Sequence, residues 1–185
     1  MKQALSHALY LDFDGVLHPQ SVYMNHKRQV FLKGEGTLFA WCSVLESHLD
    51  AYPDLPIVLS TSWVEAKGFG HALKRLPKSL AARVVGATWH SHLKQDLEFK
   101  AWWEQSSRFE QIERDVRIRR VERWVSIDDE VETWPESHAH HLIACHHDEG
   151  LGRALTQMDL REKLQGLMSD EPSWNNRVMN RKLHP

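Results

Sequence analysis

The sequence predicts an α/β fold in which helices cover both faces of a parallel sheet, a doubly wound three-layer sandwich. Two observations carry this prediction. Short apolar runs alternate with amphipathic helical patterns, as they do in βαβ units. Several of these runs end in acidic or hydroxyl residues, where the carboxyl ends of parallel strands open onto ligand sites. The 185 residues, 42% hydrophobic and 26% charged, suffice for one buried core and favour a single domain.

Five apolar runs are the expected strands. Residues 8–13 form the first run, which ends in acid before a glycine. Residues 57–59 precede three hydroxyl residues, and residues 124–127 precede two acids. Residues 83–88 and 141–145 form two weaker runs. Buried parallel strands are typically short and almost continuously apolar, so all five runs fit one sheet.

Helical patterns occupy the segments between these runs. Thr37 is the expected cap of a helix over residues 38–49, whose apolar residues recur at spacings of three and four. Residues 64–76 form a poorer helix because two glycines interrupt the pattern. Residues 99–120 and residues 156–168 each carry one apolar stripe, and each segment is predicted as one helix.

The remaining segments define the expected domain organisation. Residues 17–36 show no clean helical pattern and predict a hairpin-like flap over the strand ends. No internal repeat or low-complexity linker divides the chain. We therefore expect one catalytic domain over residues 1–170, followed by an extension or tail at residues 171–185.

Charge and cysteine usage exclude several classes of protein. Lys plus Arg number 23 against 25 for Asp plus Glu, which argues against a chain built mainly to coat DNA or an anionic membrane. Cys42 and Cys145 are far apart and lack metal-binding spacing, so we expect buried thiols in a reducing compartment. No apolar run reaches 18 residues, and acids appear before a secretory segment could form. The cytoplasm is the expected location.

Acidic and hydroxyl residues follow three of the predicted strands. Because the carboxyl ends of parallel strands meet at one rim, these side chains are expected to converge. Four carboxylates at one rim would repel one another, which implies a hard divalent cation, most naturally Mg²⁺. The residues concerned are Asp12 and Asp14, then Ser60, Thr61 and Ser62, then Asp128 and Asp129.

The segment DFDG at residues 12–15 has a mechanical interpretation. Alternate residues of an extended chain point the same way, so Asp12 and Asp14 can face one ligand while Phe13 points to the other side. Gly15 allows the chain to turn away without placing a side chain in the path of the ligand.

Three segments resemble motifs of the haloacid dehalogenase (HAD) superfamily. LYLDFDGVLHP, IVLSTSW and WVSIDDE are similar to its first, second and fourth motifs and occur in the same order. DGVLHP, STSW and the short distance between them most resemble small capless members, including the phosphatase-like domains of multi-domain RNA repair proteins. The resemblance covers about residues 9–151. It implies a HAD-like parallel sheet with a small flap and no large cap.

The resemblance implies a role for each acid. Asp12 would be the nucleophile that forms an aspartyl-phosphate, and Asp14 the acid that protonates the leaving oxygen and then activates water. An Asp at position 14 points to phosphoryl transfer instead of dehalogenation. Mg²⁺ would be held by the Asp12 carboxylate, the Asp14 backbone carbonyl and Asp128, with Asp129 binding directly or through water.

The resemblance also implies groups that bind the phosphoryl moiety. Thr61 best matches the phosphate-binding hydroxyl, and Ser60 and Ser62 remain register alternatives. The third motif of the family supplies a cation that stabilises the phosphoryl transition state. Arg108 is our choice because it opens a helix 20 residues before the acidic pair. Lys94 and Lys100 are the alternatives.

Several aromatic and basic residues are candidates for substrate contact. Trp63 directly follows the phosphate-binding segment and, with Gly15, is predicted to lie against the substrate. Aromatic faces can stack on bases, although core packing is the expected use of at least half of the eight tryptophans. Residues 117–123 hold four arginines, which form either a basic stripe for nucleic acid or an ordinary helix exterior. Five histidines are expected at a strand end or facing solvent: His138, His140, His141, His146 and His147.

These observations together predict a Mg²⁺-dependent phosphohydrolase that acts through an aspartyl-phosphate. The short distances between motifs predict an open site, which suits a large substrate such as a nucleic-acid terminal phosphate or a phosphoprotein. One alternative is a phosphatase of nucleotides or sugars whose site is closed by a dimer partner. Another is a non-catalytic Mg²⁺-binding module, and a third is a response-regulator receiver, which the DxDG signature fits poorly. The oligomeric state is left open, and no membrane partner is expected.

Overall fold

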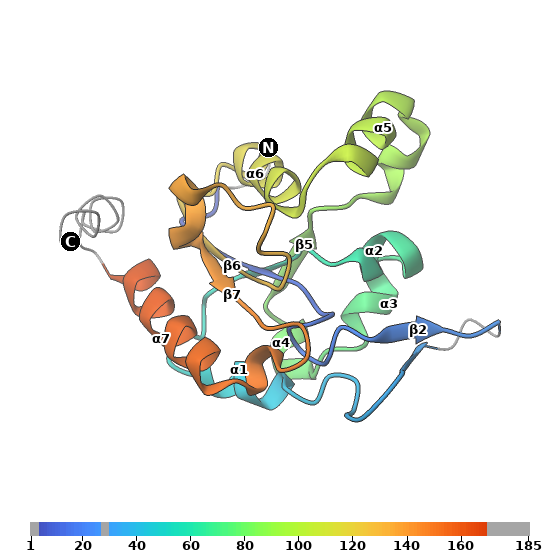
Figure 1. Ribbon diagram of the computed structural model, residues 1–185. Coiled ribbons are helices and arrows are strands. Elements are labelled where there is room, and N and C mark those ends of the chain that lie inside the picture. The colour runs from blue at the N-terminus through green and yellow to red at the C-terminus, as the bar shows by residue number, and fades with distance from the viewer. Residues whose placement is uncertain (1–3, 27–29, 170–185) are drawn as a thin grey trace.

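The computed structural model describes residues 4–26 and 30–169 and confirms the predicted α/β fold. Five parallel strands form the central sheet in the order β5-β4-β1-β6-β7 (Figure 1). The chain therefore adds β4 and β5 on one side of β1 and then adds β6 and β7 on the other side. The strands are β1 His7–Leu11, β4 Ile57–Leu59, β5 Val84–Ala87, β6 Arg123–Asp128 and β7 Leu142–Ala144.

All five predicted strands are present: β4 has the expected ends, and the ends of the other four differ from the expected ones by one or two residues. The central strand β1 pairs with both β4 and β6, and Leu9 lies opposite Ile57 on one side and Val125 on the other. Residue 12 falls just beyond β1, where its backbone N–H still donates to the carbonyl of Ile127 at 3.2 Å. The catalytic candidates thus begin where the sheet ends.

Side chains of β1 alternate between two apolar clusters, which makes the fold a three-layer sandwich. Leu9 and Leu11 pack into one cluster, whereas Ala8 and Tyr10 pack into the other. Figure 1 shows α6 on one side of the sheet and α1 with α7 on the other. The helices are α1 Cys42–Leu49, α2 Ser62–Lys67, α3 Phe69–Leu73, α4 Lys78–Ala81, α5 Leu97–Gln105, α6 Arg108–Arg119 and α7 Ala154–Met168, with 3₁₀ helices η1 Ser91–Gln95, η2 Glu136–His141 and η3 Gly150–Gly152.

The start of α1 differs from the prediction. Thr37 does not cap the helix, since residues 38–41 form a turn and Trp41 occupies the N-cap position. Phe39 adopts a left-handed backbone conformation with φ of 62°. Its ring packs edge-on against Phe13 with 5.3 Å between centroids. Packing beneath the strand ends therefore overrides the helical pattern of this segment.

Two segments predicted as single helices are each divided. The pattern over residues 64–76 becomes α2 and α3, separated at Gly68, whose φ is 91°. The pattern over residues 99–120 becomes α5 and α6, because Ser107 caps a new helix. The Ser107 hydroxyl accepts from the Glu110 N–H, and the Glu110 carboxylate accepts from the Ser107 N–H at 2.8 Å. This reciprocal capping box starts α6 independently of the apolar stripe.

The predicted flap contains a two-stranded hairpin. Strand β2 Val22–Met24 pairs antiparallel with β3 Val30–Leu32, and Figure 1 shows the hairpin projecting from the body of the protein. Val22 and Val30 pack against the larger apolar cluster. The hairpin is thus attached to the domain by its apolar residues.

Other organisational predictions have different outcomes. Cys42 and Cys145 are buried and free, as expected. Within residues 4–26 and 30–169, no helix is long and apolar enough to cross a membrane. The expected domain over residues 1–170 stays a prediction, and the expected tail at residues 171–185 lies outside the described residues.

Candidate active site

The ends of β1, β4 and β6 meet at one rim, where a polar cavity of about 340 Å³ opens. Since β1 lies between β4 and β6, the residues that follow these strands are brought together by the sheet itself. The cavity is lined by Asp12, Asp14, Gln20, Ser62, Arg108, Asp129, Glu130, Glu132 and His147.

Asp12 lies at the bottom of this cavity and is only 4% exposed. Its Oδ1 accepts from the backbone N–H of Phe13 at 2.7 Å. Burial raises the pKa of Asp12, as does the neighbouring Asp14 carboxylate, while Arg108 opposes the rise. The Phe13 hydrogen bond and the nearby Thr61 side chain also lower the pKa of this carboxyl group. The chain therefore holds a desolvated carboxyl group in a fixed orientation.

Asp128 and Asp129 complete an acidic cluster with Asp12. Oxygen atoms of the three carboxylates lie within 4.8 Å of one another. Burial, followed by repulsion from Asp12, raises the pKa of Asp128 well above its ordinary range and that of Asp129 to about 6. Gly15 packs closely against Asp129, because a Cβ at residue 15 would lie 2.2 Å from Asp129 Oδ2. Any larger residue would displace the Asp129 carboxylate.

The acidic cluster fits a hard divalent cation. Among the residues that the structure describes, the buried Asp129 Oδ2 has no hydrogen-bond partner, and the buried Asp128 Oδ2 has only the Arg108 guanidinium 3.4 Å away, without a hydrogen bond. Buried carboxylate oxygens without donors are strongly unfavourable unless a cation neutralises them. Their oxygen-only donor set suits Mg²⁺, which prefers carboxylates and water. The residues thus match the metal that the sequence predicts.

Among the side chains that the structure describes, Arg108 supplies a cation to this cluster. Its Nη2 lies 3.6 Å from Asp12 Oδ2, and its Nε lies 3.4 Å from Asp128 Oδ2. Burial alone lowers the pKa of Arg108, but the two carboxylates raise it above its ordinary value. Of the alternatives, Lys100 is exposed and pairs with Glu104 at 3.6 Å, and Lys94 belongs to η1. The geometry therefore brings the preferred sequence candidate to the carboxylates.

Asp14 is held by two side chains that are not acids. The Nε1–H of Trp63 donates to both oxygens of Asp14, at 2.9 and 3.1 Å. His18 is completely buried, and its Nε2 lies 3.0 Å from Asp14 Oδ1. Trp63, expected against the substrate, is buried and contacts Asp14 instead. His18 was missed by sequence reasoning, although it belongs to the DGVLHP segment that carries the resemblance.

The three hydroxyl residues after β4 occupy different environments. Ser60 is fully buried, whereas Ser62 is exposed and lines the cavity. Thr61 caps α2, since its Oγ1 accepts from the backbone N–H of Trp63 at 3.4 Å. The Thr61 side chain also lowers the pKa of Asp12, so Thr61 is the hydroxyl residue that acts on the nucleophile candidate.

The basic segment over residues 117–123 does not form one exposed stripe. Arg119 is 7% exposed, and its Nε lies 2.6 Å from Asp115 Oδ2. The guanidinium of Arg123 donates to the carbonyl of Gly166 at 2.7 Å. Two of its four arginines, Arg119 and Arg123, therefore bind acceptors within the fold.

The histidines near β7 divide into two groups. His141 stacks on Trp124 with 4.0 Å between ring centroids, and burial lowers its pKa to about 4. His146 and His147 form with Asp148 a second, largely exposed group whose ligand atoms lie within 4.8 Å of one another. Among these three residues, only His147 lines the cavity that Asp12 also lines. Of the two groups of possible metal ligands, the acidic cluster is the more buried.

Comparison with known proteins identifies the family. No curated protein and no solved structure matches the chain. Residues 8–155 match the family described as the HAD domain in Swiss Army Knife RNA repair proteins. The match begins within β1 and ends within α7, so it includes every strand end that supplies the acidic cluster. Because it covers most of the 185 residues, the chain belongs to this family of HAD domains.

Proposed function

We propose that the protein is a phosphatase that hydrolyses phosphoric monoesters in the presence of Mg²⁺ through an aspartyl-phosphate on Asp12. The convergence of Asp12 with Arg108 and the Asp128–Asp129 pair at one rim carries the proposal. Membership of the HAD family supports a phosphohydrolase. Each part of the cluster has a use in phosphoryl transfer, which consists mainly of positioning and charge stabilisation.

The first half of the reaction transfers the phosphoryl group to the protein. An Asp12 carboxylate oxygen attacks phosphorus, and the bond between phosphorus and the ester oxygen breaks. Asp14 gives its proton to that leaving oxygen, so the product departs as an alcohol. Arg108 and the Thr61 hydroxyl would stabilise the charge on the phosphoryl oxygens.

The second half regenerates Asp12. Asp14, now a carboxylate, takes a proton from water, and the water oxygen attacks phosphorus. The bond from phosphorus to the Asp12 oxygen breaks, releasing inorganic phosphate and the free carboxylate. Asp14 is protonated again at the end, so protons balance over the cycle.

The Asp12 carboxylate, the Asp14 backbone carbonyl and Asp128 would hold Mg²⁺, with Asp129 bound directly or through water. Bound Mg²⁺ supplies positive charge that offsets the carboxylates and the phosphoryl oxygens. Without such a cation, an anionic substrate would meet five carboxylates in one cavity, those of Asp12, Asp14, Asp129, Glu130 and Glu132.

An open, capless site suits a large substrate better than a small metabolite. Between β1 and β4 the described residues hold one small hairpin and α1, and this hairpin is the expected flap. The family description names RNA repair proteins, which favours a nucleic-acid terminal phosphate over a phosphoprotein. A nucleotide or sugar phosphatase closed by a dimer partner is the competing interpretation.

Asp12→Asn tests the proposal. The amide oxygen is a poor nucleophile, so turnover of an aryl phosphate in Mg²⁺ should fall by roughly a thousandfold or more. Asp148→Asn makes the same chemical change in the exposed histidine-rich group and should leave turnover near the wild-type value. Wild-type turnover by the Asp12→Asn protein would exclude the aspartyl-phosphate mechanism. No turnover by the unaltered protein would instead support a non-catalytic module.

A further inference from the structure

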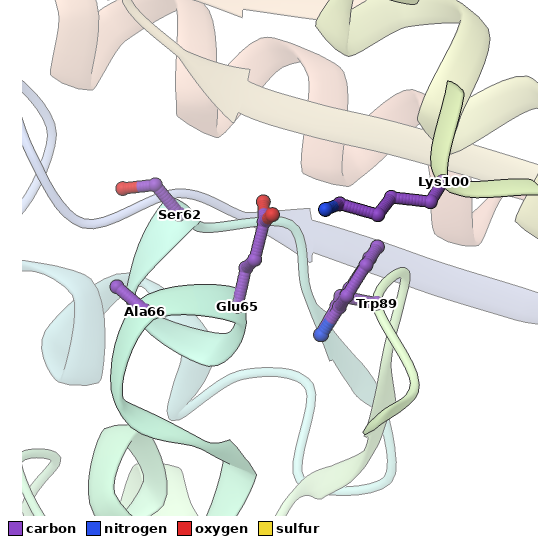
Figure 2. A pocket seen from close by; sticks show the side chains of 5 residues that line it. All are labelled: Ser62, Glu65, Ala66, Trp89 and Lys100. Atoms are coloured by element: carbon purple, nitrogen blue, oxygen red, sulfur yellow. The ribbon is translucent and has the colours of Figure 1, made fainter. Parts of the chain in front are cut away.

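A second cavity, of about 540 Å³, adjoins the catalytic one. Ser62 lines both cavities, so they are neighbours at this residue. Figure 2 shows the lining side chains, with the Lys100 ammonium extending toward the Glu65 carboxylate and Trp89 beside them. Ser62, Glu65 and Ala66 come from α2, Trp89 follows β5, and Lys100 comes from α5.

The position of this cavity determines which part of a substrate can enter it. It lies toward β5, whereas the other side of the catalytic cavity carries Asp129, Glu130 and Glu132. The second cavity instead holds one acid, Glu65, and one base, Lys100, which also pairs with Glu104 at 3.6 Å. A further phosphate group is therefore repelled less on this side than beside the three acids. A group attached to a phosphate at Asp12 is therefore directed past Ser62 into the second cavity.

The wall of the cavity is rigid and aromatic. Trp89 is almost fully buried and packs against Trp103 with 4.8 Å between ring centroids, and against Phe99 at 5.6 Å. The Nε1–H of Trp103 donates to Glu65 Oε2 at 2.9 Å, which fixes the Glu65 carboxylate. Pre-organised aromatic surface beside a fixed polar group is typical of ligand sites.

The charged groups at the cavity make it selective for a particular chemistry. Glu65 can accept hydrogen bonds, while Lys100, 54% exposed in its side chain, can donate them or pair with a phosphate. Trp89 and Ala66 supply carbon surface to the same cavity. A nucleobase combines these features, because it is a flat ring system with donors and acceptors along one edge.

We propose that this second cavity binds the nucleoside that carries the scissile phosphate. The inference rests on the proposed phosphatase function and adds the part of the substrate that the protein recognises. The cavity volume lies within the range of about 300–1,000 Å³ that encloses small organic ligands. Trp89 is 4% exposed, so only a small part of it faces the cavity, together with the exposed Ala66. A sugar phosphate would leave this apolar surface uncovered, so it would bind and react less well.

Filling the cavity tests the inference. The assay compares kcat/KM for a nucleoside monophosphate and for ribose 5-phosphate, and we expect the unaltered protein to prefer the nucleotide. Ala66→Phe should reduce that preference roughly tenfold, because the new ring occupies the space of the base. If Ala66→Phe fails to fold, Lys100→Met at an exposed position provides the second test. This variant should also reduce the preference for the nucleotide. Lys74→Ala removes an exposed lysine that lines neither cavity and serves as the matched control.

Further measurements distinguish a failure of the phosphatase proposal from a failure of the cavity proposal. No hydrolysis of any phosphomonoester by the unaltered protein would overturn the phosphatase function. Binding of the free nucleoside, measured by calorimetry, would still test the cavity in that case. If both cavity variants hydrolyse phosphomonoesters with an unchanged preference for the nucleotide, the cavity assignment alone is overturned. Faster hydrolysis of a phosphopeptide than of any nucleotide would have the same consequence.

The source of the nucleoside is settled by a direct comparison. A terminally phosphorylated oligonucleotide is assayed beside the mononucleotide. A higher kcat/KM for the oligonucleotide assigns the cavity to a nucleic-acid end, and a higher value for the mononucleotide assigns it to a free nucleotide. Both results support nucleoside recognition, provided that Ala66→Phe reduces them relative to ribose 5-phosphate.

Discussion

Asp14 is the side chain of the candidate site whose orientation is most completely determined by its neighbours. Trp63 donates to both of its carboxylate oxygens, and His18 contacts one of them from a fully buried position. The ring of Trp63 is in turn packed edge-on against Phe13 and Phe39. Proton transfer requires the donor to lie within hydrogen-bonding reach of the leaving oxygen. Trp63 and His18 are therefore positioning residues for the proposed general acid.

The Trp63→Phe substitution should reveal this positioning role when substrates with different leaving groups are compared. An alkyl phosphate needs its leaving oxygen protonated, so its kcat should fall by at least about tenfold when Asp14 is released. A nitrophenyl phosphate has a stable leaving group, so its kcat should fall much less. Steady-state kinetics on both substrates measures the difference.

Trp134→Phe is the matched control for that substitution. Trp134 is also nearly buried, and its Nε1 has no hydrogen-bond partner among the residues described. It should lower neither kcat. Equal losses for both substrates in Trp63→Phe would show that the substitution disturbs the site in general and that Trp63 does not position the acid.

The residues of the site differ in how far the sequence predicts them. Asp12, Asp128 and Asp129 could be predicted to meet because each follows a strand of one parallel sheet, and they do meet. The contact of His18 could not be predicted from strand ends. It depends on Gly15, whose φ of 67° turns the chain so that His18 returns to Asp14. The catalytic roles of all these residues remain predictions.

Among the secondary-structure elements, α6 matters most for the site because Arg108 is its first residue. The sequence predicts one helix through residues 99–120, since the apolar stripe continues across the junction. A capping box at Ser107 and Glu110 instead begins a new helix there. The backbone N–H of Arg108 also donates to Glu130 Oε1 at 3.3 Å. The local capping interaction thus determines where the cation enters the cavity.

Ser107→Ala should weaken the start of α6. Loss of an N-cap hydroxyl costs about 1 kcal/mol of unfolding free energy, which urea denaturation can measure. A less ordered first turn should also lower kcat/KM several-fold, because Arg108 would be held less precisely against Asp12.

Ser47→Ala provides the comparison for this effect. The Ser47 hydroxyl donates to the carbonyl of Val44 inside α1 and is exposed. Its removal should change the unfolding free energy by less than about 0.5 kcal/mol. Equal stability of the two variants would mean that the capping box does not determine the start of α6.

At the scale of the whole molecule, the sheet order brings three acidic side chains close together in the folded protein, even without a bound ligand. Strand β1 lies at the centre, so Asp12 is brought beside Asp128 and Asp129 from the neighbouring strand β6. Burial raises the pKa of all three carboxyl groups. The folded state therefore carries an electrostatic cost that a bound cation would offset. The general α/β topology could be predicted from the sequence, but this cost depends on distances that the sequence does not specify.

Mg²⁺ should accordingly stabilise the protein against thermal unfolding. A ligand that binds only the folded state at about 100 times its Kd adds about 2.7 kcal/mol, which for a chain of this size raises Tm by roughly 5–10 °C. Asp129→Asn should reduce this increase, while Asp148→Asn should preserve it, since Asp148 belongs to the exposed histidine-rich group. Calorimetry with and without Mg²⁺ distinguishes the two sites. A Tm increase that is lost in Asp148→Asn and kept in Asp129→Asn would place the metal at the exposed group, and the acidic cluster would then require another explanation for its oxygens without hydrogen bonds.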